Sequence, residues 1–353
     1  MFNTFSPILN RKIKVALVGC GRISENHFSA LEKFYDSIDL VAVCDIDNTA
    51  LNTAATRHQV PGFSDMSEML DSMDVDLVIL CTPSGLHAKQ TILAAKHKVH
   101  VVCEKPIATR YQDGIEMVKA CDEAGVRLFV VKQNRKNATL ALLKRAVSEN
   151  RFGQIRMVQL NVFWTRPQSY YDMGNGWRGT WEFDGGAFMN QASHYVDLID
   201  WLIGPVERIH AMTSTTREIE AEDTGVLNIK WRNGALGAMS VTMLTYPKNL
   251  EGSITIIGDK GTVRVGGLAV NEIQHWQFED QKDYDAEVSD ASYQTTSVYG
   301  FGHPGYYESV IQTMRGTGAP EVDGREGLKS LELLTAAYMS ARDDKSVGLP
   351  LVL

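Results

Sequence analysis

Apolar positions in the first half of the chain gather into short continuous runs separated by amphipathic stretches. Five such runs stand at residues 14–19, 40–45, 76–83, 100–106 and 126–131. The stretch 84–98, between the third run and the fourth, has apolar residues near helical spacing. Continuous apolar strands separated by helices predict a parallel sheet that is covered on both faces. We therefore expect an N-terminal α/β domain of the Rossmann type, with a doubly wound parallel sheet, over residues 1–134.

Beyond the fifth run, apolar residues alternate with polar ones, which is typical of strands with one buried face. The alternating stretches are residues 155–164, 206–214, 225–231, 235–244 and 253–258. Turn signals stand at 232–234 (RNG) and 258–261 (GDKG), and helical patterns cover 184–203 and 325–343. These features predict a C-terminal α+β domain over 135–353 with an open, mostly antiparallel sheet. Its last segment is a candidate to pack back on the Rossmann domain. An open sheet with an apolar face also predicts a homo-oligomer, because such a face needs a partner.

Composition narrows the class of protein. The 353 residues are 44% hydrophobic and 22% charged, with a formal net charge of −8. This length predicts two domains, and the negative charge argues against nonspecific nucleic-acid binding. No apolar run approaches the roughly 20 residues that cross a bilayer, and the first residues lack the apolar centre of a signal peptide. The five cysteines form no CxxC pair, and no metal-ligand spacing occurs. We expect a cytoplasmic protein without a metal, whose partners include neither nucleic acid nor membrane.

A glycine-rich segment, GCGRIS at residues 19–24, follows the first apolar run and precedes a helical stretch. Gly19 permits a tight turn, and Gly21 lets the backbone approach a pyrophosphate at a helix N-terminus. Asp45 ends the second run, where a carboxylate binds the adenosine ribose and repels a 2′-phosphate. The pattern predicts NAD as the cofactor in preference to NADP. The residues expected at the cofactor are Gly19, Gly21, Arg22, Ile23, Asp45, Thr82, Pro83, His87, Glu104, Lys105 and Gln133.

The fourth apolar run leads into CEKPIA, which places Lys105 at the end of a buried strand and Pro106 directly after it. In doubly wound sheets, ligands bind outside the carboxyl ends of the strands. This position brings the lysine close to the expected nicotinamide. Lys105 is therefore predicted to be catalytic, although a lysine at a strand end is often only solvated.

Four segments in the order GCGRIS, CTPSGLH, CEKPIA and DGGAFMNQASHYVDLIDWLIG resemble the glucose-fructose oxidoreductase/inositol dehydrogenase (Gfo/Idh/MocA) family. The resemblance covers nearly the whole chain and implies that Lys105 is a catalytic-site residue. The family also has an aspartate four residues before a histidine. Here the histidine is His194, and the aspartate position holds Asn190. The resemblance thus implies that Lys105 and His194 share the substrate proton.

Within that family, QNR at 133–135, WRGTW at 177–181 and MNQASH at 189–194 are most similar to UDP-N-acetylglucosaminuronate 3-dehydrogenases of the WlbA/WbpB type. This resemblance implies oxidation of the 3′-hydroxyl of a nucleotide sugar during biosynthesis of a surface polysaccharide such as lipopolysaccharide. It also implies packing of the C-terminal sheets into a dimer or tetramer.

The loop-like stretch 163–186, rich in aromatic residues, glycine and arginine, is the candidate binding region for such an anionic substrate. The residues expected to bind substrate are Lys105, Asn134, Arg166, Tyr170, Arg178, Asn190 and His194. Either Lys105 stabilises the alkoxide while His194 takes the proton, or Lys105 is itself the base. The sequence leaves both assignments open.

The leading hypothesis is therefore an NAD-dependent dehydrogenase of a nucleotide-sugar uronate. A dehydrogenase of a free sugar, inositol or another polyol is the alternative among enzymes. A noncatalytic regulator that senses dinucleotides is the alternative from another class.

Overall fold

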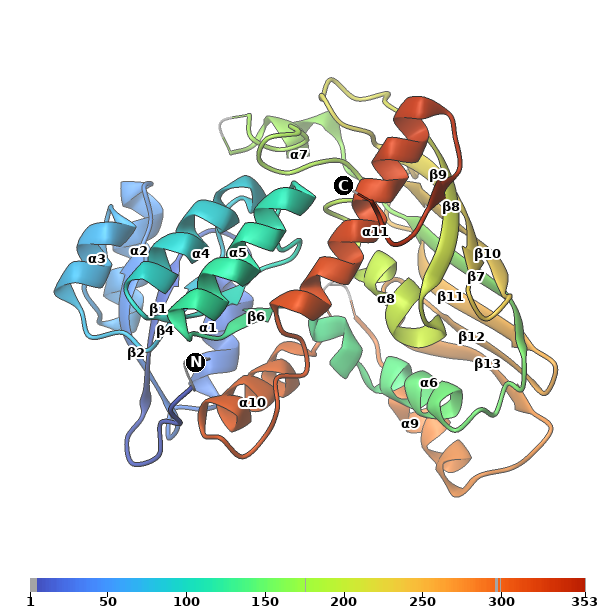
Figure 1. Ribbon diagram of the computed structural model, residues 1–353, viewed down its shortest axis with the longest axis horizontal. Coiled ribbons are helices and arrows are strands. Elements are labelled where there is room, and N and C mark those ends of the chain that lie inside the picture. Colours follow the sequence, from blue (N-terminus) through green and yellow to red (C-terminus); the bar gives the residue numbers. More distant parts are fainter. Residues whose placement is uncertain (1–4, 175, 296–297, 299, 353) are drawn as a thin grey trace. The chain divides into compact units, whose positions relative to one another are not determined.

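The computed structural model describes residues 5–174, 176–295, 298 and 300–352 (Figure 1). The chain divides into two compact units. Unit 1 is Met1–Lys132 with His303–Leu331, and unit 2 is Gln133–Gly302 with Glu332–Leu353. The first boundary lies two residues before the one expected from the sequence, and the segment from His303 to Leu331 belongs to unit 1.

Unit 1 is built on a six-stranded parallel sheet in the order β3-β2-β1-β4-β5-β6. This is the strand order of the Rossmann fold. The strands are β1 (Ile13–Val18), β2 (Ile38–Cys44), β3 (Gly62–Phe63), β4 (Leu77–Leu80), β5 (His100–Cys103) and β6 (Leu128–Val130). Each of the five predicted apolar runs overlaps one of these strands. Every residue of β4 is buried, as expected for a strand that is covered on both faces.

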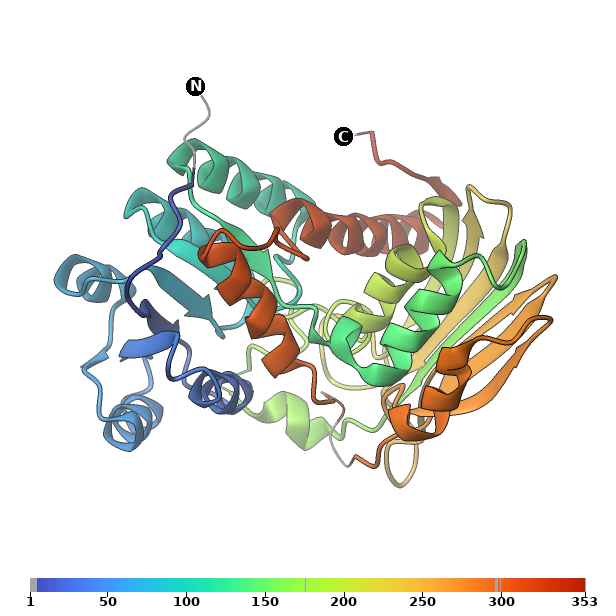
Figure 2. The ribbon, with the colours of Figure 1, turned by 90° about the horizontal axis from the view of Figure 1, so that it is seen from below.

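Helices lie on both faces of this sheet (Figure 2). They are α1 (Ser24–Glu32), α2 (Asn48–His58), α3 (Met66–Ser72), α4 (His87–Lys96), α5 (Tyr111–Ala124), α10 (His303–Met314) and the first part of α11 (Gly324–Asp343), with a 3₁₀ turn η1 (Ser84–Leu86) before α4. Helix α10 packs against α1 and supplies Tyr306, Tyr307 and Met314 to the same core as β1. The segment after residue 302 therefore completes the core of the Rossmann unit.

Unit 2 contains an eight-stranded sheet in the order β13-β12-β11-β7-β10-β9-β8-β14. Strands β7 and β10 pair in parallel and the other neighbours are antiparallel, which confirms the predicted fold class. The strands are β7 (Ile155–Phe163), β8 (Val206–Ser214), β9 (Thr224–Trp231), β10 (Leu236–Thr242), β11 (Glu251–Gly258), β12 (Gly261–Gly266), β13 (Glu272–Phe278) and β14 (Val347–Gly348). The two predicted turns join β9 to β10 and β11 to β12.

The remaining helical segments of unit 2 are η2 (Gln133–Lys136), α6 (Ala138–Ser148), α7 (Gln168–Asp172), α8 (Ser193–Ile203), η3 (Asp283–Glu287) and α9 (Val288–Ala291). The helix predicted over 184–203 begins only at Ser193, so that prediction is wrong for its first nine residues. Gly185 has φ +77°, which helical backbone does not allow, and the Glu222 carboxylate lies where a side chain at Gly186 would project. Residues 184–192 instead form a turn that leads into α8.

No helix within the described residues is both long and apolar enough to span a bilayer.

Candidate functional site

The glycine loop after β1 has the geometry of a dinucleotide cradle. Gly19 has φ +96°, and a Cβ atom there would lie 2.7 Å from the backbone of Cys81, so only glycine fits. A Cβ atom at Gly21 would meet nothing within 4 Å, which leaves open space in front of the loop. Helix α1 begins after Ile23 without a side-chain cap; the N–H groups of Ser24 and Asn26 donate to the carbonyls of Gly21 and Ile23, and that of Glu25, between them, lies at the helix start where a phosphate binds. The loop therefore fits the pyrophosphate of NAD, and the expected contacts of Arg22 and Ile23 with the cofactor stay predictions.

Asp45, directly after β2, is fixed against this loop. Its Oδ2 atom accepts a hydrogen bond from the Cys20 backbone N–H at 2.6 Å, and its Oδ1 atom accepts one from the Asp47 N–H at 2.8 Å. A pocket of about 300 Å³ beside the loop is lined in part by Cys20, Asp47 and Arg57. The sequence analysis did not predict that Arg57 lies beside the glycine loop. Its guanidinium is paired with Glu25 at 2.6 Å, whereas the Asp45 carboxylate accepts backbone N–H bonds.

The turn after β4 carries Thr82, Pro83 and His87. His87 is fully buried, with Nδ1 3.0 Å from the Pro106 carbonyl oxygen and Nε2 3.1 Å from the Thr82 carbonyl oxygen. Burial lowers the pKa of His87. This histidine therefore ties the turn after β4 to the turn after β5, and its predicted contact with the cofactor stays a prediction.

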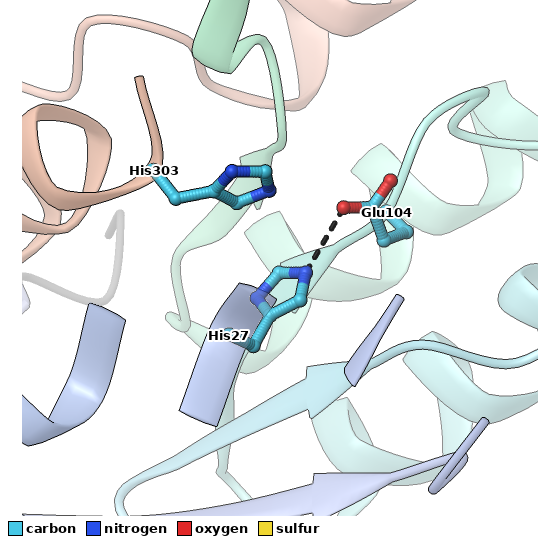
Figure 3. A group of neighbouring side chains, drawn as sticks. All are labelled: His27, Glu104 and His303. Atoms are coloured by element: carbon cyan, nitrogen blue, oxygen red, sulfur yellow. Dashed lines mark hydrogen bonds and ion pairs between the residues drawn. The ribbon is translucent and has the colours of Figure 1, made fainter. Parts of the chain in front are cut away.

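Glu104 and Lys105 follow β5 directly and have different surroundings. Glu104 is buried and its carboxylate faces His27 (Figure 3), whereas Lys105 is half-buried. Burial opposes ionisation of Glu104, but the hydrogen bond from His27 and nearby positive charge lower its pKa to about 2. Glu104 is thus an ionised carboxylate inside unit 1. Its expected role at the cofactor also stays a prediction.

In unit 2, the predicted residues of η2 and α8 meet. Gln133 Nε2 lies 3.1 Å from His194 Nε2, and both side chains are buried. Because an amide N–H donates, Nε2 of His194 is the acceptor, and an imidazole with such an acceptor nitrogen can take a proton. Two residues further along η2, Arg135 forms a bidentate ion pair with Asp197. Asn134, also expected to bind substrate, is buried in the same 3₁₀ turn.

The sequence did not reveal that Asn190 has a carboxylate partner. Asn190 Nδ2 donates to Asp184 Oδ1 at 2.5 Å, and Asp184 Oδ2 accepts from the Gly179 N–H at 2.8 Å. Asp184 thus fixes the orientation of the Asn190 amide. Where the family has an aspartate, this chain has Asn190, and a carboxylate is supplied next to it by Asp184, six residues earlier in the sequence.

Arg166, Tyr170 and Arg178 also lie together in unit 2. Arg178 Nη1 donates to the Tyr170 hydroxyl at 2.9 Å, and the guanidinium of Arg166 is 5.4 Å from the Tyr170 ring. A pocket of about 490 Å³ next to Arg178 is also lined by Asp172, Glu218 and Glu220. Only the arginine side of this region favours an anion. Residue 175, in the same stretch, lies outside the described residues.

Glu222 is a buried acid that sequence analysis missed. Its Oε1 atom accepts hydrogen bonds from the Phe188 N–H at 2.8 Å and the Tyr338 hydroxyl at 3.0 Å, while Oε2 has no hydrogen-bond partner. Burial raises the pKa of Glu222 to about 7. Glu222 therefore fixes the turn before α8 through Phe188. Its carboxyl group stays protonated to a higher pH in the folded protein than in the unfolded chain.

Replacing Glu222 with glutamine is expected to remove a pH dependence of stability. The folded pKa lies above the unfolded value, so the wild type loses stability as pH rises from about 4.5 through about 7, by up to about 3 kcal/mol. Glutamine keeps the acceptor for Phe188 and does not titrate. Urea unfolding at pH 5.5 and 8.5 should show the advantage of the variant growing with pH. Equal pH dependence in both proteins would contradict the assignment.

Comparisons with known proteins agree with this geometry. Residues 13–132 match the model of the oxidoreductase family's NAD-binding Rossmann fold, and residues 144–349 match that of its C-terminal alpha/beta domain, both from the Gfo/Idh/MocA set. The WlbA dehydrogenase of Chromobacterium violaceum, solved with NADH and UDP-GlcNAcA, is 64% identical, with TM-score 0.95 and 99% of each chain covered. The Bordetella pertussis WlbA dehydrogenase, solved with the same ligands, is 60% identical with TM-score 0.95, over 98% of this chain and 100% of that one. A D-apiose dehydrogenase of Paraburkholderia graminis is 26% identical over 96% of this chain and 90% of the relative.

Proposed function

Since the chain belongs to the Gfo/Idh/MocA oxidoreductase family, we propose that it catalyses the NAD-dependent oxidation of the 3′-hydroxyl of UDP-N-acetylglucosaminuronate. The observation that carries this proposal is the 60–64% identity, over practically the whole chain, to two dehydrogenases solved with NADH and UDP-GlcNAcA. The D-apiose dehydrogenase of Paraburkholderia graminis, by contrast, is 26% identical.

The residues of unit 1 would hold the cofactor. The open space at Gly21 and the uncapped start of α1 suit the pyrophosphate, and Asp45 suits the adenosine ribose hydroxyls. When bound, NAD supplies the hydride acceptor. The ammonium of Lys105 would stabilise negative charge that develops on the substrate oxygen.

The residues of unit 2 would hold the sugar. His194, fixed by Gln133, is a candidate base for the 3′-hydroxyl proton, and Lys105 is the alternative base. Asn190, oriented by Asp184, can hydrogen-bond a sugar hydroxyl without adding charge. Arg166 and Arg178 would bind the phosphates or the carboxylate of the substrate.

A substrate panel tests the proposal. UDP-N-acetylglucosaminuronate, UDP-N-acetylglucosamine, myo-inositol and glucose would each be incubated with NAD, followed by absorbance of NADH and mass analysis of the products. One charge-assisted contact contributes roughly 1.5–3 kcal/mol, so the uronate should be preferred over the uncharged nucleotide sugar by about one to two decades in kcat/KM. Only the uronate should lose two hydrogens at a substantial rate.

Faster turnover of inositol or glucose would overturn the substrate assignment and favour the polyol alternative. NADH binding with no turnover of any compound would favour the dinucleotide-sensing regulator. A 2-keto acid such as 2-oxoglutarate is included in parallel reactions, so that NADH that stays bound is not mistaken for inactivity.

We also propose that the chain forms a homo-oligomer, a dimer or a tetramer, through the sheet of unit 2. On this sheet the exposed Met157 pairs in register with Leu236 on one side and Ile257 on the other, and both of those are exposed. Three adjacent apolar side chains in solvent favour a covering partner. Met157→Lys is expected to yield a smaller species by light scattering, and an unchanged mass would contradict this surface.

The cytoplasm as the compartment, and a surface polysaccharide such as lipopolysaccharide as the end product, belong to the same proposal. All five cysteines are free thiols, which suits a reducing compartment. Fractionation of cells that produce the protein tests the location, and its recovery outside the cytoplasm would contradict it.

A further inference from the structure

Three elements of unit 1 that are far apart in sequence are joined by a chain of buried hydrogen bonds. His27 on α1 has Nδ1 2.6 Å from the hydroxyl of Tyr307 on α10, and its Nε2 lies 2.9 Å from Glu104 Oε1 (Figure 3). The other carboxylate oxygen, Oε2, accepts a hydrogen bond from the backbone N–H of Lys105 at 3.0 Å. The series of hydrogen bonds therefore runs from Tyr307 through His27 and Glu104 to the backbone of Lys105.

Each oxygen of the Glu104 carboxylate has a hydrogen-bond donor. Glu104 is ionised, so His27 Nε2 must carry the proton that it shares with Oε1. The carboxylate, the His27 ring that contacts it and the Tyr307 ring that contacts His27 are almost completely buried. A buried carboxylate that lost its partner would be left unpaired at a large energetic cost, so the arrangement holds the carboxylate in one place.

Both oxygens of Glu104 are engaged by groups of unit 1, which leaves the carboxylate little capacity to contact a cofactor. The residue whose backbone the carboxylate fixes is Lys105, the predicted catalytic residue. We propose that His27, held by Tyr307, and Glu104 are positioning residues for Lys105: the Glu104 carboxylate fixes the backbone that carries the lysine and connects it to α1, the helix whose N-terminus faces the dinucleotide cradle. The catalytic half of this inference rests on the proposed function.

His303 lies beside His27 and Glu104 but outside their hydrogen bonds, so it serves as a comparison within the cluster of these three residues. Its ring is turned toward Glu104 and packs edge-on against His27, with ring centroids 5.3 Å apart. Its Nε2 atom has no hydrogen-bond partner among the described residues, and burial lowers its pKa to about 4, so the ring is neutral. The donor atoms of His27, Glu104 and His303 lie within 4.8 Å of one another, the spacing of a possible metal site. However, the His27–Glu104 hydrogen bond already pairs two of the three donors.

The first test measures the proposed contact directly and needs no substrate. In protein labelled with ¹⁵N-lysine, amide hydrogen exchange is compared for Lys105 and Lys14. The Lys14 N–H also donates to a side-chain carboxylate of unit 1, Asp76 Oδ2, at 2.8 Å, and so provides a matched internal control. His27→Leu should accelerate exchange at Lys105 by about tenfold or more and leave Lys14 within about twofold. Unchanged protection of Lys105 would overturn the proposal.

Tyr307→Phe removes only the hydroxyl that is hydrogen-bonded to His27. It is the milder variant if His27→Leu fails to fold. It should accelerate exchange at Lys105 by about threefold, again without an effect on Lys14. Glu104→Gln keeps an acceptor for the Lys105 N–H and should restore part of the protection that Glu104→Leu loses. A graded series is expected from a positioning role, whereas loss of protection at both lysines would indicate general destabilisation and contradict it.

The second test is kinetic. His27→Leu should lower kcat by about tenfold to a hundredfold while KM for NAD and the Kd of NADH change by less than about threefold. His303→Leu, in the same cluster but outside the hydrogen-bonded chain, should keep kcat within about threefold. A loss of NADH affinity with unchanged kcat would make Glu104 a cofactor contact instead. A stoichiometric metal in the purified protein that His303→Leu removes would also overturn the proposal. If the wild type oxidises no panel compound, the proposed function fails, and the exchange experiment still decides the positioning of Lys105.

Discussion

Lys105→Met is expected to lower kcat by about three to four orders of magnitude and to leave the Kd of NADH within about threefold. Methionine keeps most of the length of the lysine side chain and removes its charge, so the alkoxide loses its electrostatic partner and the reaction loses a candidate base. The contacts that fix the cofactor cradle, Asp45 with the Cys20 N–H and the start of α1, do not involve this side chain. Stopped-flow measurement of NADH formation together with fluorescence titration of NADH separates the two effects.

Lys89→Met is the matched control. Lys89 is an exposed lysine on α4, in the same unit, and its replacement removes the same charge. The control should keep kcat within about twofold. If the Lys105 variant behaved like the control, CEKPIA would be an ordinary strand end with a solvated lysine.

His194→Asn in the same assay would distinguish the two candidate bases. A loss comparable with that of Lys105→Met would indicate the histidine, and a much smaller one the lysine.

Hydrophobic periodicity was sufficient to predict the Rossmann unit because its main strands are buried on both faces. Strand β3 has only two residues, Gly62 and Phe63, and a run that short carries no periodic signal. Strand β13 is an edge strand with mostly exposed or half-exposed residues, and its apolar pattern is correspondingly weak. The false helical start at residue 184 arose because a turn with Gly185 in the left-handed region has the same apolar spacing as a helix.

The same contrast applies to the candidate site. Lys105 and Asp45 could be predicted because each ends an apolar run, a local signal with a known place in doubly wound sheets. The partners of Glu104 could not, because His27 and Tyr307 are separated from each other by 280 positions and meet only in the folded core. Asp184 is close to Asn190 in sequence, but only the turn at Gly185 brings its carboxylate to the amide.

Breaking the buried Arg135–Asp197 ion pair of unit 2 is expected to have a large effect on stability. Arg135 donates to Asp197 through Nε and Nη2, both at 2.7 Å, and the two side chains are only 4% and 5% exposed. Asp197→Leu leaves the guanidinium buried without this partner, which costs about 3–5 kcal/mol. We expect a decrease in Tm of about 10 °C and a matching shift of the urea midpoint. A change below about 1 kcal/mol would show that solvent reaches the pair.

The double variant Arg135→Met/Asp197→Leu separates stability from function. With both charges replaced by apolar side chains of similar volume, most of the lost stability should return. The activity should not return with it, because the ion pair fixes η2 against α8, and the same two elements carry Gln133 and His194. Without that fixed geometry, the histidine loses its orientation, and kcat is expected to stay about tenfold below wild type at a temperature where the double variant is fully folded. Recovery of both stability and kcat would mean that the pair contributes only to folding, and that Gln133 holds His194 without its help.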